Sequence, residues 1–357
     1  MMELIILDTS IRMLSVFDTF ESLIWTERYS SYGDFEVCTS VNDVILEALK
    51  DDYYLWLKES DQTMIVEDRK IESDAENGHC FTVTGRSLES MLDRRIVWKQ
   101  TILSGDFQNG IKKLLDENII NPSDPARKVE GLIFEESTDP QITNLKIEAQ
   151  FTGDNLYDAI KKLCDSKHIG FRIKLSDDNK FVFKLYAGTD RSYDQLSNPY
   201  VVFSPKFENI INTNYLQSKK TLKTVTLVAG EGEGAERKTT TATCPSGAGK
   251  GLNRREMYTD ARDISSAVDN HTLTDSEYNA QLVQRGLENL TNNVPTKSFE
   301  GKVETTRMYR YGEDFFMGDV VQIINEYGIE GRSRVTEFIR SQNKEGIDSY
   351  PTFINVE

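Results

Sequence analysis

The chain has 357 residues, of which 38% are hydrophobic and 10% aromatic. That length exceeds a single ordinary core, so we expect two to four domains, and the apolar content excludes an intrinsically disordered chain. The formal net charge is −16 and is spread along the sequence. Because acidic surfaces repel nucleic-acid phosphates, specific nucleic-acid binding is disfavoured. No stretch approaches 18 apolar residues, so we expect no membrane span.

The N-terminal region is predicted to be rich in strands. Short runs of β-branched and aromatic residues indicate strands at 4–7, 11–17, 22–29, 35–38, 53–58, 63–73 and 80–84. Tyr32-Gly33-Asp34 is typical of a turn, and Glu76-Asn77-Gly78 predicts a hairpin. Residues 42–50 predict a short helix, and Ser87 is expected to cap another that runs to Arg95.

Helical periodicity begins at about residue 100. Residues 106–120 predict a helix that Asn121-Pro122 ends. Asp154 is expected to cap a second helix, with Gly170 past its end. Alternating apolar residues at 171–175 and 181–185 then predict a hairpin, so a helix followed by a hairpin forms a small α+β module.

The remaining chain returns to strands. Residues 199–228 predict strands, and Gly230 to Gly251 contains two glycine-rich stretches around a threonine run, which indicates a β-ribbon with mobile tips. Thr274 and Glu277 form a capping-box pattern that opens a helix to about Asn292. Further strands are predicted at 299–308, 319–325, 333–339 and 351–356.

The overall prediction is an α+β, β-rich chain of four segments. These are an N-terminal β-barrel domain (1–100), an α/β connector with the helix–hairpin module (101–198), a β-ribbon with mobile glycine-rich loops and a helix (199–298), and C-terminal β-barrel strands (299–357). A faint internal echo relates Val66-Glu67 to Thr336-Glu337, each within a strand that follows another apolar strand. The echo favours two similar β-barrels, one at each end.

The four cysteines, Cys38, Cys80, Cys164 and Cys244, are far apart and form no Cys-x-x-Cys pair. This pattern argues against a disulfide framework, and reduced thiols in a cytoplasmic compartment are expected. The first ten residues have no basic region, so they do not resemble a signal peptide.

No residue pattern indicates a catalytic, cofactor or metal site. His79 lies beside a predicted turn, no Gly-x-Ser-x-Gly motif is present, and Cys164 with His168 supplies two metal ligands where four are usual. The stretch 247–251 lacks the glycine and the Ser or Thr that a phosphate loop requires, and 230–234 lacks a following helix. The 58 acidic residues make any carboxylate pair uninformative. We therefore expect a non-enzymatic protein.

Two compact Asp–Arg clusters are the candidate functional residues. Asp190 and Arg191 form one, and Asp260, Arg262 and Asp263 form the other. A guanidinium can bind a carboxylate through two parallel hydrogen bonds, so such clusters can stabilise a local turn. The alternative is a clamp between domains or subunits, and both interpretations stay open.

Several motifs together resemble the tail hub family of long-tailed bacteriophages, which is similar to the baseplate hub of contractile phages and to the N-terminal part of tail-associated lysins. They occur in the family's order: Trp25, Arg28 and Tyr29 with Tyr32-Gly33-Asp34-Phe35-Glu36; Val83-Thr84-Gly85-Arg86-Ser87-Leu88 with Asp93-Arg94-Arg95; Tyr186-Ala187-Gly188-Thr189-Asp190-Arg191-Ser192; Asn198-Pro199 with Val202-Phe203-Ser204; Arg254-Arg255-Glu256 with Asp260-Ala261-Arg262-Asp263; and Gly318-Asp319-Val320.

The resemblance implies two β-barrel domains joined by small mixed α/β domains, and a homotrimer whose six similar barrels form a pseudo-six-fold ring. The implied partners are the distal tail ring or tail tube, the tape measure protein and a tip fibre or spike protein. The implied location is the virion tail tip, with assembly in the bacterial host cytoplasm. A cell-wall-degrading tail enzyme and the hub of a contractile injection or secretion spike are the alternatives.

Overall fold

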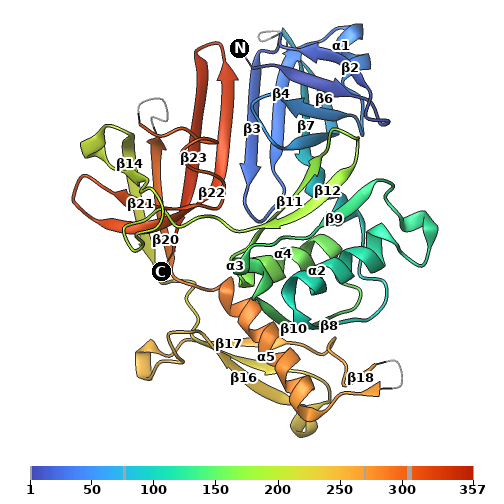
Figure 1. Ribbon diagram of the computed structural model, residues 1–357, viewed down its shortest axis with the longest axis vertical. Coiled ribbons are helices and arrows are strands. Elements are labelled where there is room, and N and C mark those ends of the chain that lie inside the picture. The colour runs from blue at the N-terminus through green and yellow to red at the C-terminus, as the bar shows by residue number, and fades with distance from the viewer. Residues whose placement is uncertain (1, 75–77, 269–270, 304–307, 357) are drawn as a thin grey trace.

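The computed structural model describes residues 2–74, 78–268, 271–303 and 308–356. Figure 1 shows two strand-rich units side by side, an α/β unit beside them, and a smaller sheet crossed by a long helix at the far end. We call these the N-terminal strand unit (2–94), the C-terminal strand unit (200–218 and 296–356), the α/β unit (95–189) and the lower unit (219–293). No helix in the described residues is long and apolar enough to cross a membrane.

The N-terminal strand unit confirms the predicted strands. Its elements are β1 (Leu4–Leu7), β2 (Met13–Phe17), β3 (Ser22–Arg28), β4 (Asp34–Ser40), α1 (Asp43–Ala48), β5 (Tyr54–Leu57), β6 (Thr63–Asp74), β7 (Gly78–Ser87) and a 3-10 helix (Leu88–Arg94). Alternation sets the faces: Phe35 and Val37 of β4 are buried, whereas Glu36 is exposed. β6 and β7 form the expected hairpin, although Glu76 and Asn77 of its turn lie outside the described residues.

Two predictions for this unit were wrong. Ser87 precedes the 3-10 helix but does not cap it with its side chain, because its hydroxyl donates to Glu89 and accepts from the Gly33 amide. Cys38 and Cys80 form a disulfide, contrary to the expectation of reduced thiols. Sequence spacing gave no sign of this, because the pairing of β4 with β7 brings together residues 42 positions apart.

The α/β unit contains the predicted helix–hairpin module. Its elements are β8 (Thr101–Asp106), α2 (Phe107–Leu115), a π-helical turn (Asp116–Ile120), a 3-10 turn (Pro125–Arg127), β9 (Leu132–Glu135), α3 (Pro140–Thr143), β10 (Lys146–Phe151), α4 (Leu156–Ser166), β11 (Gly170–Leu175) and β12 (Phe181–Tyr186). The cap of α4 is Asn155 rather than Asp154, since the Asn155 side chain accepts from the Tyr157 and Asp158 amides. β9 adds a parallel strand beside β12 that the sequence did not reveal.

The lower unit is a three-stranded sheet covered by one helix. Its elements are β15 (Val225–Ala229), a 3-10 turn (Gly234–Glu236), β16 (Thr239–Thr243), a second 3-10 turn (Gly251–Asn253), β17 (Glu256–Asp260), β18 (Ala267–Val268), β19 (His271–Thr272) and α5 (Asp275–Thr291). β15 and β16 are the predicted ribbon, and β17 joins β15 in parallel. The capping box of Thr274 and Glu277 is formed as predicted.

The C-terminal strand unit draws on two parts of the chain. Its elements are β13 (Val202–Phe203), a 3-10 turn (Pro205–Phe207), β14 (Ile210–Ser218), β20 (Thr296–Val303), β21 (Val320–Ile324), β22 (Glu330–Asn343) and β23 (Gly346–Asn355). The predicted strand at 299–308 corresponds to β20, and residues 304–307 lie outside the described residues. β13 and β14 fall in the predicted third segment but pair with β21 and β20. The division into four segments stays a prediction.

One sheet of 13 strands joins the two ends of the chain. Its main path runs β14-β20-β23-β22-β3-β4-β7-β6-β5-β1-β2, with β21 and β13 attached beside β22. The junction is an antiparallel pairing of β3 with β22. Among the described strands this path closes into no barrel, so the two predicted barrels are not confirmed. The chain is β-rich with mixed α/β parts, as predicted.

The main path contains two similar four-stranded sets, β3-β4-β7-β6 and β14-β20-β23-β22. In each, a long hairpin carries a bulge where its first strand changes partner. The β6–β7 register shifts between Val66 and Asp68, and the β22–β23 register shifts between Val335 and Glu337. The faint sequence echo thus has a structural counterpart, but it was one residue out of register, since Val66 corresponds to Val335.

Gly286 sets how closely α5 packs on its sheet. A Cβ there would lie 2.7 Å from both Ala242 Cβ and Val228 Cγ2. We therefore expect Gly286→Leu to lower the free energy of unfolding by roughly 2–4 kcal/mol, because the helix must move off the sheet. Asn279→Leu, at an exposed position of the same helix, is the matched control and should stay within about 0.5 kcal/mol. Urea unfolding measures both, and equal midpoints would contradict this packing.

Candidate functional site

The seam between β3 and β22 is the first part of the candidate site. Arg28 lies opposite Glu337 and Trp25 lies opposite Arg340. Arg28 Nε donates to Glu337 Oε1 at 2.6 Å, and its Nη1 donates to Asp34 Oδ2 at 2.5 Å. Cross-strand pairs of opposite charge favour one register over its neighbours. The seam is therefore specified by side chains as well as by the backbone ladder.

A buried ion pair lies on the inner face of the seam. Glu27 and Arg340 contact one another directly, with side chains only 6% and 8% exposed. Ser60 Oγ donates to Glu27 Oε1 at 2.7 Å, and Tyr311 Oη donates to Glu27 Oε2 at 3.2 Å. The Arg340 guanidinium also lies over the Phe338 ring, 4.6 Å from its centre. Such a pair is costly to break, because either charge alone would remain buried.

Tyr29, directly after β3, contacts all three upper units. Its hydroxyl donates to the His168 carbonyl of the α/β unit at 2.9 Å, and its amide donates to the Thr336 carbonyl of β22 at 3.0 Å. Tyr186 Oη donates a hydrogen bond to the Tyr29 carbonyl at 3.0 Å, and the two rings pack edge to face. Burial raises the pKa of both phenols, so both hydroxyls stay protonated and can donate.

Glycines let the backbone of three segments approach this tyrosine. A Cβ on Gly170 would lie 2.5 Å from the Tyr29 ring, and one on Gly318 would lie 2.2 Å from it. Gly318 also has φ +91, a conformation that favours glycine. A Cβ on Gly188 would lie 1.8 Å from the Gly318 carbonyl oxygen. Tyr29, Tyr186, Gly170, Gly188 and Gly318 form what we call the Tyr29 junction.

The first predicted Asp–Arg cluster lies beside the Tyr29 junction. Arg191 Nε donates to Asp319 Oδ2 at 2.7 Å, and both side chains are largely buried. Asp319 also accepts from the Thr189 and Phe316 amides. Asp190 accepts from Arg332 at 3.2 Å. These pairs tie the segment after β12 to the C-terminal strand unit. The sequence singled out Asp190 and Arg191 as candidates, whereas Asp319 appeared only within a motif and Arg332 gave no signal.

The second predicted cluster is divided between two roles. Arg262 folds back on Asp260, and its hydrogen bonds lower the pKa of Asp260 to about 2. Arg237 also donates to Asp260 at 2.7 Å, so this pair stabilises a turn at the surface of the lower unit. Asp263 instead accepts two bonds from Arg285 of α5, at 2.9 and 3.2 Å.

Arg285 carries this contact to the neighbouring unit. It donates to the Gln150 carbonyl of β10 at 3.3 Å and lies 3.8 Å from Glu288. Burial raises the pKa of Glu288, and the Arg285 charge opposes that shift. Asp263 therefore reaches the α/β unit through Arg285, whereas Asp260 and Arg262 do not.

Arg86 forms the link from the N-terminal strand unit to the α/β unit. It binds Glu67 through two hydrogen bonds of 2.6 and 2.9 Å and Asp93 through one of 2.9 Å, which raises its pKa further. Asn155 Nδ2 at the start of α4 donates to Asp93 Oδ1 at 2.9 Å. The same arginine lies 4.9 Å from the centre of the Tyr32 ring.

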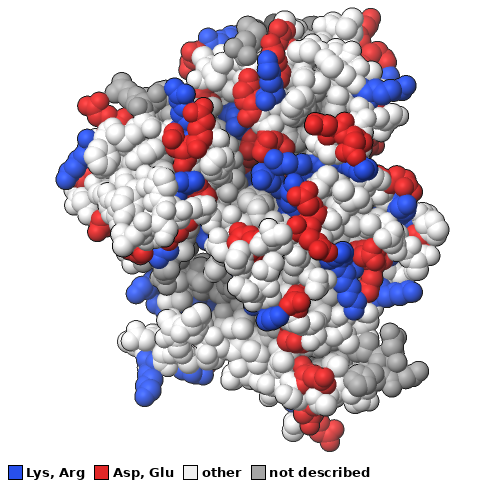
Figure 2. Space-filling view, in the orientation of Figure 1, with Lys and Arg blue, Asp and Glu red and all other residues white. Residues whose placement is uncertain are grey.

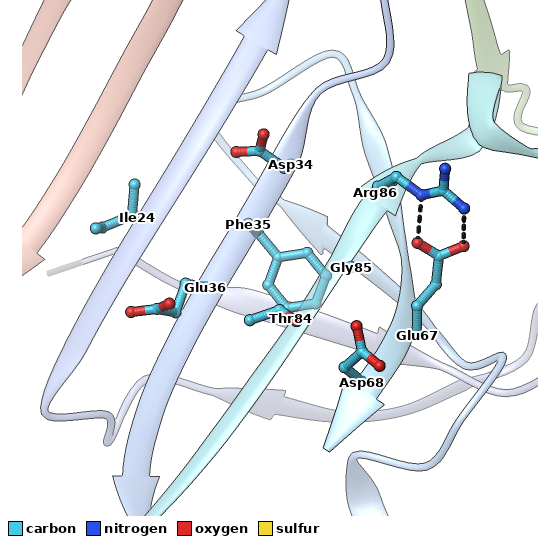
Figure 3. A pocket seen from close by; sticks show the side chains of 9 residues that line it. All are labelled: Ile24, Asp34, Phe35, Glu36, Glu67, Asp68, Thr84, Gly85 and Arg86. Carbon is cyan, nitrogen blue, oxygen red and sulfur yellow. Dashed lines mark hydrogen bonds and ion pairs between the residues drawn. The ribbon is translucent and has the colours of Figure 1, made fainter. Parts of the chain in front are cut away.

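A shallow depression lies on the outer face of β3, β4, β6 and β7. It is lined by Ile24, Asp34, Phe35, Glu36, Glu67, Asp68, Thr84, Gly85 and Arg86. Figure 3 shows four carboxylates around it, with only Glu67 turned towards the Arg86 guanidinium. Its acidic rim and open shape suit contact with a large or charged surface better than enclosure of a small molecule.

The other candidate groups do not assemble into a reactive site. His79 is exposed and bonds to Ser73, and His168 lies beyond the end of α4 with φ +56. Cys164 is buried, and burial raises its pKa well above the usual value. No group of three or more metal-binding side chains occurs among the described residues. The geometry thus favours contacts that hold chain segments together.

The chain belongs to the family of Siphovirus ReqiPepy6 Gp37-like proteins, whose model matches residues 3–353. Prophage tail protein gp18 from Listeria monocytogenes EGD-e has a similar fold, with TM-score 0.59, 16% identity, and 99% of this chain and 94% of that chain covered. The tail protein from Neisseria meningitidis MC58 aligns with TM-score 0.57 and 10% identity, covering 100% and 97%.

The 43 kDa tail protein of prophage MuSo2 from Shewanella oneidensis also aligns with TM-score 0.57 and 10% identity, covering 99% of this chain and 98% of that chain. No curated protein sequence matches the chain significantly. The chain therefore belongs to a siphovirus protein family, and it shares its fold with these solved tail proteins.

The Glu27–Arg340 pair yields one stability prediction. Arg340→Met should lower the free energy of unfolding by about 3–5 kcal/mol, because Glu27 is left buried without its partner. Adding Glu27→Met should restore most of that loss. Lys344→Met is the matched control, since its pair with Glu21 is exposed, and should cost less than about 1 kcal/mol. Urea unfolding of the three variants and the wild-type chain measures the pattern, and a double variant no more stable than Arg340→Met would contradict it.

The Tyr29 junction yields a second prediction, based on two glycines with nearly equal φ. Gly318 has φ +91 beside the Tyr29 ring, whereas Gly312 has φ +88 and no atom within 4 Å of the place a Cβ would take. Gly312→Ala should cost about 1–2 kcal/mol from backbone strain alone. Gly318→Ala should cost roughly 1–3 kcal/mol more, because it also displaces Tyr29. Similar thermal unfolding shifts for both would argue against close packing at the junction.

Proposed function

We propose that this protein is a structural hub of a bacteriophage tail tip, in which three copies form a pseudo-six-fold ring. The ring would join the tail tube or distal tail ring to a tip fibre or spike protein, with the tape measure protein above it. The observation that carries the proposal is the pair of similar four-stranded sets, one from each end of the chain, joined edge to edge by β3 and β22.

The repeated sets support six-fold pseudo-symmetry from three copies. Each copy contributes two sets with a matching bulged hairpin, so three copies contribute six. A cyclic assembly of identical chains closes only if each copy offers two complementary surfaces. The sheet path is compatible with this requirement, because the strands at its two ends are different. The two predicted barrels belong to this proposal.

The site contacts support a rigid copy. The Tyr29 junction and the Arg191–Asp319 pair lock the α/β unit against both strand units. We propose that Asp190 and Arg191 act as an inter-domain clamp, and that Asp263 does the same through Arg285. Asp260 and Arg262 remain exposed on the lower unit and are available to a neighbouring subunit.

Charge supports a passage for DNA without specific binding. Figure 2 shows acidic side chains interspersed with basic ones over the visible face, with no broad basic surface. The depression of Figure 3 places Asp34, Glu36 and Asp68 on the outer face of the first set. If this face lines the ring, its carboxylates would repel passing DNA and limit adhesion. The loops between Gly230 and Gly251 are proposed as a partner contact. Leu252, which directly follows them, is fully exposed.

Two rivals predict different observations. A cell-wall-degrading enzyme would clear a band in a zymogram of host cell walls, whereas a hub leaves the gel unchanged. The hub of a contractile injection or secretion spike would be encoded beside a sheath protein, whereas the hub of a non-contractile tail would not.

Mass measurement of the purified full-length chain tests the proposal. At high concentration in solution, alone or with the adjoining tail ring protein, we expect a species of three chains. Stable trimers need interfaces on the order of 2,000 Å² or more, so the species should survive dilution into the micromolar range. A chain that stays monomeric in both conditions would contradict the ring.

A further inference from the structure

The two four-stranded sets can be aligned residue by residue through their bulges. The bulge residues Glu67 and Thr336 correspond, so Asp68 of β6 corresponds to Glu337 of β22. In the first set Trp25 lies opposite Phe35, which lies opposite Gly85. In the second set Tyr215 lies opposite Phe299, which lies opposite Phe353. β14 therefore corresponds to β3, just as β6 corresponds to β22.

The corresponding strands β6 and β22 differ in one respect, which is whether a strand pairs with the outer edge beyond the bulge. Beyond its bulge, β22 pairs with β23 on one side and with β3 on the other. β6 pairs with β7 over the same stretch, but β5 reaches only Thr63 to Ile65. In the part of the chain that the structure describes, no strand pairs with the outer edge of residues 68–73. The strand that corresponds to the missing partner is β14, which lies at the far end of the sheet path.

We propose that β14 of one copy pairs antiparallel with the outer edge of β6 in the next copy, repeating between copies the pairing that β3 and β22 make within one. The inference rests on the proposed ring and names its closing contact. The register follows from the alignment: Ser218 lies opposite Asp68, Gln217 opposite Arg69 and Leu216 opposite Lys70, as Arg28, Glu27 and Thr26 lie opposite Glu337, Phe338 and Ile339.

Exposed apolar groups mark both edges. Leu216 of β14 is 49% exposed and Ile71 of β6 is 53% exposed. Ile71 also lines a second depression together with Leu46 and Phe81, directly beside the open edge of β6. An extended strand with open hydrogen-bonding groups and apolar side chains is a site for addition of another strand. The proposed register places Tyr215 opposite Ile71, directly next to that depression.

Charge fits the same register. Lys219 and Lys220 follow β14 directly, and the pairing carries them past Ser218 towards Asp68 and Glu67. The N-terminal 100 residues contain 20 acidic and 10 basic side chains, so the surface around β6 attracts a basic segment. A parallel pairing would instead place these lysines near Asp74, at the far end of the strand.

The number of strands sets the size of the resulting ring. Each copy contributes eight strands, which are those of its two four-stranded sets. Three copies, with each strand about 4.8 Å from the next, give a circumference of roughly 115 Å and a diameter of about 37 Å before strand tilt enlarges it. The outer face of the sheet, with the depression of Figure 3, would then line the opening. The free edge of β2 at the other end of the path would lie outside this ring.

Cysteine pairs test the edge and the register together. Tyr29 N–H donates to the Thr336 carbonyl, so the Thr26–Ile339 pair falls at a non-hydrogen-bonded position, where side chains are closest. The corresponding pair between copies is Leu216 with Lys70. In a Cys244→Ser background, Lys70→Cys with Leu216→Cys should give covalent trimers after mild oxidation. A mixture of the two single variants should stop at dimers.

Met13→Cys with Leu216→Cys is the matched control, because Met13 lies on the other free edge, β2, and is 59% exposed. Native mass spectrometry of each unoxidised variant reports the assembly. Trimers that cross-link through Lys70 and not through Met13 support the proposal. Trimers that cross-link through neither pair, or through Met13, contradict the pairing of β14 with β6 but do not contradict the trimeric ring. Variants that never assemble, with a wild-type chain that is also monomeric, overturn both.

Discussion

The buried ion pair of Glu27 and Arg340 joins residues that are 313 positions apart in the sequence. Such a pair is a poor source of stability by itself, because both charges lose their hydration. It is a strong source of specificity, since any other register of β3 against β22 would leave a buried charge without a partner. The seam therefore fixes how the two ends of the chain meet, and with it the orientation of both four-stranded sets.

The other contacts depend on that alignment. Tyr29 follows β3 directly, so the seam delivers its ring to Gly318 and its hydroxyl to the α/β unit. Close approach at Gly170, Gly188 and Gly318 then packs these segments tightly against one another. Arg191 and Asp319 add a largely buried pair at the same place. The two outer sheet edges are thus held in a fixed relation, which is compatible with the proposed ring.

Local structure was accessible from the sequence, but long-range pairing was not. The capping box at Thr274, the α2 helix and the β11–β12 hairpin follow from short patterns that fix local geometry. The Cys38–Cys80 disulfide, the parallel β9 strand and the seam all join residues far apart in the chain, and periodicity carries no record of their partners. Asp190 and Arg191 were identified by composition, whereas Asp319 was found only within a weak motif. Glu27 and Arg340 gave no signal, because a charged residue within a strand is ordinarily exposed.

The internal repeat shows the same limit. The sequence related Val66 to Thr336, but only the two bulges placed Val66 against Val335.

Electron cryo-microscopy of the intact tail tip, at a resolution that separates strands, tests the central claim most directly. The account predicts three copies around the tail axis, with β3 beside β22 in each copy and the outer face of both sets towards the opening. A different number of copies, or these strands facing away from the axis, would contradict it.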